Sequence, residues 1–135
     1  MIYSQDCPMS GILVVDDKPA HRDQIAEILT NAGYLVTGKA SSGAEAITMF
    51  HQMEPDLVTL DLIMPDMNGM DLLRIMKGTS PMVSFLICTS ICHEMIADLA
   101  KRSGADALFH KPISDSSLLA AVSKILGAPH QEKEA

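Results

Sequence analysis

Short apolar runs alternate along the chain with longer segments of helical periodicity. Five runs have the length and composition of strands: residues 12–15, 34–37, 57–60, 83–88 and 106–109. The segments between and after them carry apolar residues at the spacing of one helical face, as Ile25, Ile28, Leu29 and Ala32 do in the first segment. The pattern therefore predicts five strands that alternate with five helices.

Local signals predict where several of these helices begin and end. Pro19 suits the first turn of the first helix, and Gly33 is placed to end it. Ser42 and Glu45 resemble a capping box at the start of the second helix. The third helix is expected from about residue 68 to residue 77, with Gly78 as its end.

This alternation predicts an α/β fold, a doubly wound parallel sheet of five strands with helices on both faces. Right-handed crossovers leave few topologies, and the flavodoxin-like strand order 2-1-3-4-5 is the natural one for five such units. A chain of 135 residues is long enough for one domain with a proper core. We expect that domain at residues 11–128, with flexible tails at residues 1–10 and 129–135.

Composition excludes several classes of partner and location. The net charge of −7 argues against direct binding to nucleic acid or to an anionic membrane surface. No apolar run approaches the roughly 20 residues that span a bilayer. The odd number of cysteines and the absence of a secretory signal pattern favour the cytoplasm. Cys88, Cys92 and His93 do not complete a zinc site, and the two thiols are expected in or near the core.

Acidic residues and one lysine stand where the predicted strands end. Asp16 and Asp17 follow the first apolar run, Asp61 follows the third and Lys111 follows the fifth, while Thr89 comes just after the fourth. In open parallel sheets, ligands bind outside the carboxyl ends of the strands. We therefore expect these five side chains at one edge of the sheet.

The expected chemistry of that edge is phosphoryl transfer. Grouped carboxylates repel one another unless a cation neutralises them, and Mg²⁺ favours hard oxygen ligands and bridges to phosphate. Asp61 is the expected nucleophile, because a carboxylate can form an acyl phosphate. Lys111 supplies a compact positive charge for a phosphoryl oxygen, and Thr89 supplies a hydroxyl donor.

Several stretches together resemble the receiver domain of two-component response regulators. They are residues 13–17, 55–69, 88–90, 104–106 and 111–112. Each stretch alone is common by chance, but their order and spacing match the receiver pattern over the whole expected domain. The resemblance implies a flavodoxin-like fold and a role in phosphorelay signalling.

The resemblance also implies a role for each acid. Asp61 would accept a phosphoryl group from the phosphohistidine of a sensor histidine kinase or a histidine phosphotransfer protein. Asp17 and Asp61 would bind Mg²⁺ directly, with the backbone carbonyl of Ile63 as a third ligand. Asp16 would hold metal-bound water. The chain would be a switch that catalyses only its own phosphorylation and dephosphorylation, rather than an enzyme acting on a separate substrate.

For the readout, the resemblance implies that Thr89 moves toward the phosphoryl group, which Lys111 also contacts. This movement would switch the face formed by the fourth helix, fifth strand and fifth helix. Receivers often carry a gating Tyr or Phe three residues before the lysine, and here that residue is Leu108. Phe109 beside it is expected in the core. We therefore expect a smaller movement, of Thr89 and its loop alone, in place of the swing of an aromatic side chain.

The output is expected to be binding to another protein, whose identity is open. Met64, Met67 and Met70 are candidates for lining such a partner surface. We expect a stand-alone switch with no output domain, since only a few residues follow the last predicted helix. The alternative is that the chain is a fragment of a larger regulator or hybrid kinase.

Two rival functions have weaker support. A Mg²⁺-dependent phosphohydrolase would need a second acid two residues after the nucleophile, where this chain has Ile63. A flavodoxin-like flavin binder would need a Ser/Thr/Gly-rich phosphate loop after the first strand. Asp16 and Asp17 stand there instead.

Overall fold

The computed structural model of the protein describes residues 11–91 and 93–129. Its strands are β2 (Gly11–Val15), β3 (Leu35–Ala40), β4 (Leu57–Leu60), β5 (Ser84–Thr89) and β6 (Ala107–His110). Its helices are α1 (Pro19–Asn31), α2 (Gly43–Met53), α3 (Gly69–Thr79), α4 (Glu94–Arg102) and α5 (Asp115–Leu126). The predicted alternation is confirmed. The predicted tails lie outside the described residues except for residue 129, and so do Cys7 and Cys92.

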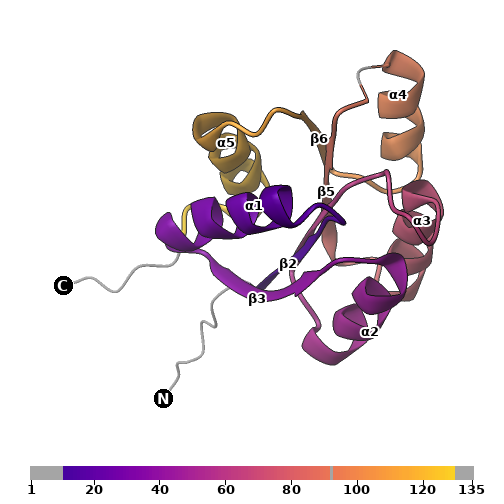
Figure 1. Cartoon of the computed structure of the whole chain (residues 1–135), viewed down its shortest axis with the longest axis horizontal. Coiled ribbons are helices and arrows are strands. Elements are labelled where there is room, and N and C mark those ends of the chain that lie inside the picture. The colour runs from indigo at the N-terminus through magenta and orange to yellow at the C-terminus, as the bar shows by residue number, and fades with distance from the viewer. Residues whose placement is uncertain (1–10, 92, 130–135) are drawn as a thin grey trace.

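The strands form one parallel sheet in the order β3-β2-β4-β5-β6. Counted along the described chain, this is the predicted flavodoxin-like order 2-1-3-4-5. Helices α1 and α5 cover one face of the sheet, and α2, α3 and α4 cover the other (Figure 1). No helix in the described part of the chain is long and apolar enough to cross a membrane.

The two faces of the sheet carry two separate apolar cores. Leu13 and Val15 of β2 pack toward α2 and α3, whereas Ile12 and Val14 pack toward α1 and α5. All five residues of β2 are buried, as expected for a strand covered on both sides. Because helices pack on both faces of the central strands, the positions of the residues that follow these strands are set by the sheet.

The structure confirms the predicted limits of α1 and the predicted start of α3, where Asn68 is the N-cap, but not the predicted end of α3. Pro19 opens α1, and Gly33 follows its C-cap with a φ of +102°, which suits glycine. Gly78 lies inside α3, which continues to Thr79, so the predicted end is wrong. Glycine costs only about 1 kcal/mol relative to alanine in a helix. Met76 in the same turn is buried, and burying its side chain favours the helical turn.

Only one half of the predicted capping box forms at the start of α2. The hydroxyl of Ser42 accepts a hydrogen bond from the backbone N–H of Glu45 at 3.1 Å. The carboxylate of Glu45 bonds instead to the N–H and hydroxyl of Ser41, at 2.7 and 2.9 Å. These bonds, the backbone bond first, lower the pKa of Glu45 below its ordinary value.

Strand β3 is longer than the predicted residues 34–37. Its register with β2 shifts by one residue, since Ile12 pairs with Val36 and Leu13 pairs with Gly38. A Cβ at Gly38 would lie 2.6 Å from the sulfur of Met53, so the strand passes close under α2. The register shift and the polar residues in the second half of β3 break the apolar alternation, so the sequence pattern does not predict that half as strand.

Candidate metal and phosphoryl site

Three acids meet at the carboxyl ends of β2 and β4. Asp16 and Asp17 directly follow β2, and Asp61 directly follows β4, its neighbour in the sheet. One carboxylate oxygen from each acid lies within 4.8 Å of the others. Asp16 and Asp61 are buried, with 0% and 2% of their surface exposed. The predicted convergence of these acids is therefore present.

Lys111, which directly follows the carboxyl end of β6, extends its side chain to this cluster. Its Nζ donates to Oδ2 of Asp16 at 2.7 Å and to Oδ2 of Asp61 at 3.1 Å. Only 6% of its side chain is exposed. Burial alone would lower the pKa of the Lys111 ammonium, but the bonds and charges of the two carboxylates outweigh burial and raise it. The lysine is therefore held as a cation among the acids.

The remaining carboxylate oxygens are only partly satisfied. Oδ1 of Asp16 accepts from the N–H of Lys18 at 2.9 Å, and Oδ1 of Asp61 accepts from the N–H of Ile63 at 3.1 Å. Oδ1 of Asp17 is buried and has no hydrogen-bond partner among the described residues. The Nζ of Lys18 lies 3.7 Å from it, which is too far for a hydrogen bond.

This arrangement fits a hard divalent cation. Lys111 pairs with Asp16 and Asp61, and the Nζ of Lys18 lies 3.7 Å from Asp17, so three carboxylates meet two ammonium groups. A dication would offset the negative charge that remains in excess. Oδ1 of Asp17, which accepts no hydrogen bond from the described residues, offers a ligand atom, and Mg²⁺ prefers oxygen ligands. The donor set of the site therefore matches the cation that the sequence predicts.

Thr89 lies at the same edge of the sheet, but its hydroxyl serves its own loop. It is fully buried, and its Oγ1 accepts a hydrogen bond from the N–H of Ile91 at 3.1 Å. Its backbone carbonyl accepts from the N–H of Lys111 at 2.8 Å. No hydrogen bond joins the Thr89 hydroxyl to Asp61 within the described ranges.

The residues just before Lys111 face opposite sides of β6. Phe109 is buried in the core between the sheet and helices α1 and α5, as predicted. Leu108 is half-buried against the other core. Cys88 of β5 is also buried, as predicted, and burial raises the pKa of its thiol to about 12.

The structure adds His21, which sequence reasoning missed. It lies in the first turns of α1, and its Nδ1 is 2.8 Å from Nζ of Lys111. The scattered histidines show no ligand spacing in the sequence, so periodicity offered no reason to select this one. Its position in the chain could have indicated it, because the first turn of a helix that follows a strand lies over the carboxyl edge of the sheet.

The loop after Asp61 folds back on itself tightly. Ile63 forms an isolated antiparallel bridge with Asn68, and the N–H of Gly69 donates to the carbonyl of Leu62 at 3.0 Å. A Cβ at Gly69 would lie 2.4 Å from the Cα and carbonyl oxygen of Leu62. Glycine at position 69 therefore allows two stretches of backbone to touch beside the candidate site.

The same loop also caps helix α2. The carboxylate of Asp66 accepts from the N–H groups of Gly43 and Ala44 at 2.8 and 3.0 Å. These bonds lower the pKa of Asp66 below its ordinary value. The loop is thus tied to a helix outside the site.

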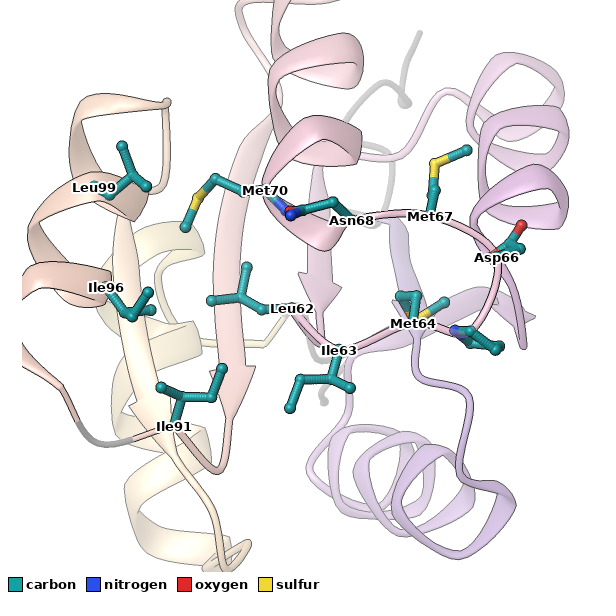
Figure 2. Close-up of a pocket in the computed structure, with 11 residues that line it drawn as sticks. Leu62, Ile63, Met64, Asp66, Met67, Asn68, Met70, Ile91, Ile96 and Leu99 are labelled. Atoms are coloured by element: carbon teal, nitrogen blue, oxygen red, sulfur yellow. The ribbon is translucent and has the colours of Figure 1, made fainter.

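A pocket of about 530 Å³, lined mostly by apolar residues but also by Asp66 and Asn68, opens between this loop and helices α3 and α4 (Figure 2). Figure 2 shows side chains of Leu62, Met70, Ile91, Ile96 and Leu99 converging on it. The three methionines that the sequence suggests for a partner surface, Met64, Met67 and Met70, all line this pocket. Their role in partner binding stays a prediction.

Comparisons with known proteins agree with this geometry. The family model "Response regulator receiver domain" matches residues 12–123. The chemotaxis protein CheY of Thermotoga maritima is 32% identical over 84% of this chain and 95% of its own length. Protein CcdB of Bacillus subtilis is 36% identical over 88% of this chain and 99% of its own length.

A solved structure supports the same assignment. The chemotaxis protein CheY4 of Vibrio cholerae has a TM-score of 0.82 and 26% identity, covering 87% of this chain and 99% of that one. The match to the family model spans β2 from its second residue, the other four strands and most of α5. The chain therefore belongs to the response regulator receiver domains, and it is a CheY-like receiver of two-component signalling.

Proposed function

We propose that Asp61 accepts a phosphoryl group and that Thr89 and Lys111 contact that group. The observation that carries the proposal is the buried contact of 3.1 Å between Lys111 Nζ and Asp61 Oδ2. A cation beside a carboxylate in a site with little water can stabilise charge that develops during transfer. The location of this pair at the carboxyl edge of the sheet also suits a ligand site.

Receiver domains bind Mg²⁺ at an acidic aspartate cluster, and this chain has such a cluster. Here we propose Asp17, Asp61 and the backbone carbonyl of Ile63 as direct ligands, with Asp16 holding metal-bound water. Oδ1 of Asp17 supports this assignment, because it accepts no hydrogen bond within the described ranges. When bound, the ion would supply positive charge for the transferring phosphoryl oxygens.

The donor is the phosphohistidine of a sensor histidine kinase or of a histidine phosphotransfer protein. A carboxylate oxygen of Asp61 attacks the phosphorus, so that an O–P bond forms while the P–N bond breaks. The departing imidazole nitrogen keeps the electron pair of that bond. Lys111 moves one N–H from Asp61 to a phosphoryl oxygen, and the hydroxyl of Thr89 donates to another.

Receiver domains are signalling switches that interact with kinases and downstream targets. In this chain we propose a switch that catalyses only its own phosphorylation and dephosphorylation and then binds an unidentified downstream protein. Thr89 would turn toward the phosphoryl group and shift the face formed by α4, β6 and α5. Because Leu108 stands in place of a gating aromatic residue, this shift would proceed through Thr89 and its loop.

The extent and location of the domain are also proposals. Residues 11–128 would form the folded domain, which the family match over residues 12–123 supports. The odd cysteine count supports a cytoplasmic location. The net charge of −7 argues against direct contact with nucleic acid.

The test is the intact mass of the protein after incubation with Mg²⁺ and acetyl phosphate. We expect one added phosphoryl group on the natural chain and none on Asp61→Asn. The control Asp56→Asn changes an acid at the opposite edge of the sheet and should still be phosphorylated. Chelating Mg²⁺ should prevent the gain in mass. An unchanged mass of the natural chain would overturn the function, and a phosphorylated Asp61→Asn would overturn the choice of residue.

A further inference from the structure

Lys111 has three hydrogen-bond donors on its ammonium group, and three acceptors surround it. They are Oδ2 of Asp16 at 2.7 Å, Nδ1 of His21 at 2.8 Å and Oδ2 of Asp61 at 3.1 Å. A lysine ammonium only donates, so Nδ1 of His21 must accept. This requires a neutral imidazole with its proton on Nε2.

We propose that His21 is a positioning residue for phosphoryl transfer, holding the ammonium of Lys111 through its unprotonated Nδ1. The part of this proposal that concerns transfer rests on the proposed function of Asp61. With Asp16 and His21 each holding one N–H, the third N–H points at Asp61. Only this third bond must change partner when the phosphoryl group arrives.

The start of α1 is built so that His21 stays beside Asp16. The N–H of Lys18 donates to Oδ1 of Asp16, and Nη1 of Arg22 donates to the carbonyl of Asp16 at 3.1 Å. Arg22 also bonds back to the carbonyl of Lys18 through its N–H at 2.9 Å. These bonds tie both sides of His21 to the residue that anchors Lys111.

Without an acceptor at position 21, one N–H of a nearly buried ammonium loses its partner. Lys111 would then rotate toward another acceptor or admit water, and its third N–H would no longer be fixed on Asp61. A hydrogen bond from a charged donor is among the stronger ones in proteins. We expect its loss to slow phosphorylation of Asp61 on the order of tenfold.

The first test is nitrogen NMR of the full chain labelled with ¹⁵N at histidine. Correlations to the ring protons assign the tautomer of His21 without any phosphorylation. The proposal predicts a proton on Nε2 and none on Nδ1. A proton on Nδ1 would overturn it, whatever the fate of Asp61 in the mass experiment.

The second test compares two substitutions with opposite hydrogen-bonding capacity. His21→Leu removes the acceptor, whereas His21→Asn places an amide oxygen near the position of Nδ1. We expect acetyl phosphate with Mg²⁺ to phosphorylate His21→Leu about tenfold more slowly than the natural chain, and His21→Asn within about threefold of it. The control His51→Leu removes an exposed histidine whose ring bonds, among the described residues, to the carbonyl of Ile47 in its own helix.

The outcomes separate this proposal from the proposed function. A natural chain that is not phosphorylated overturns the function of Asp61 but leaves the tautomer measurement as the test of the Lys111 contact. A natural rate in His21→Leu overturns the positioning role. Equal slowing in His21→Leu and His21→Asn, in step with their melting temperatures, also overturns it, because a structural role alone would produce that pattern. If His21→Leu does not fold, the rate of His21→Asn and the tautomer decide.

Discussion

The two edges of the sheet use aspartate in opposite ways. At the amino edge, Asp56 precedes β4 and accepts from the N–H of Gly11 at 2.9 Å, while Asp106 precedes β6 and accepts from the N–H of Phe85 at 2.8 Å. Both acids are exposed, and they precede different strands. At the carboxyl edge, the acids are crowded within 4.8 Å, and Asp16 and Asp61 are buried.

The difference shows that surroundings, rather than residue type, decide the role of an acid. Each amino-edge carboxylate meets a backbone donor of the neighbouring strand, so its charge is satisfied locally and joins two strands. At the carboxyl edge, Asp16 and Asp61 share Lys111, and Oδ1 of Asp17 has no hydrogen-bond partner in the described part of the chain. The first arrangement stabilises the sheet, and the second keeps capacity for a ligand.

Removing the lysine should produce the largest effect on stability. Lys111→Met leaves Asp16 and Asp61 buried without their cation, which costs about 3 kcal/mol of unfolding free energy at neutral pH without divalent metal. Mg²⁺ should then raise the melting temperature of Lys111→Met more than that of the natural chain. Urea unfolding with and without Mg²⁺ measures both effects.

A matched surface lysine serves as the control for this measurement. Lys39 pairs with Asp23 at 3.2 Å, but both side chains are largely exposed. Lys39→Met should therefore change the unfolding free energy by less than about 1 kcal/mol. Similar losses in the two variants would remove the distinction between the buried carboxyl edge and an ordinary surface pair.

A smaller effect is expected at the amino edge. Asp56→Ala leaves the N–H of the buried Gly11 without its partner, so we expect a loss of about 1 kcal/mol. Phosphorylation by acetyl phosphate should keep its natural rate, because Asp56 lies at the other end of β4. If a fully folded Asp56→Ala were phosphorylated more slowly than the natural chain, the amino edge would influence the chemistry at the carboxyl edge.

The smallest effect concerns Asp66, which is exposed like the amino-edge acids but belongs to the loop beside the site. The N–H groups of Gly43 and Ala44 lower its pKa below the ordinary 3.8, so its charge stabilises the fold above that value. This contribution disappears as pH falls through the lowered folded pKa. The stability difference between the natural chain and Asp66→Asn should therefore be full at neutral pH and shrink below about pH 3.8. A difference that is constant with pH would contradict a charge effect.

The sequence predicts the sheet and the acidic cluster for one physical reason. Central strands covered on both faces are continuous apolar runs, so an acid at the end of such a run stands out and marks the sheet edge. Asp16, Asp17 and Asp61 follow the central strands β2 and β4 in this way, whereas Lys111 follows the short edge strand β6. The ends of β3 and α3 were missed, because a register shift at Thr37 breaks the alternation and packing of Met76 outweighs the helix-ending tendency of Gly78.

Contacts between distant segments depend on packing that one sequence does not reveal. His21 and Lys111 are 90 positions apart, and their contact requires α1 to cross the carboxyl edge at a particular angle. The same holds for Asp66, whose bonds to α2 reach 23 positions back along the chain. Such residues carry no local pattern, so only the fold identifies them.

The touching backbones at Gly69 have a consequence for variation in this protein. In a saturation library, position 69 should tolerate no replacement, since even alanine would place its Cβ 2.4 Å from the backbone of Leu62. Gly78, where an added Cβ meets nothing within 4 Å, should accept many replacements. Two glycines at the opposite ends of one helix would thus differ sharply in their freedom to change.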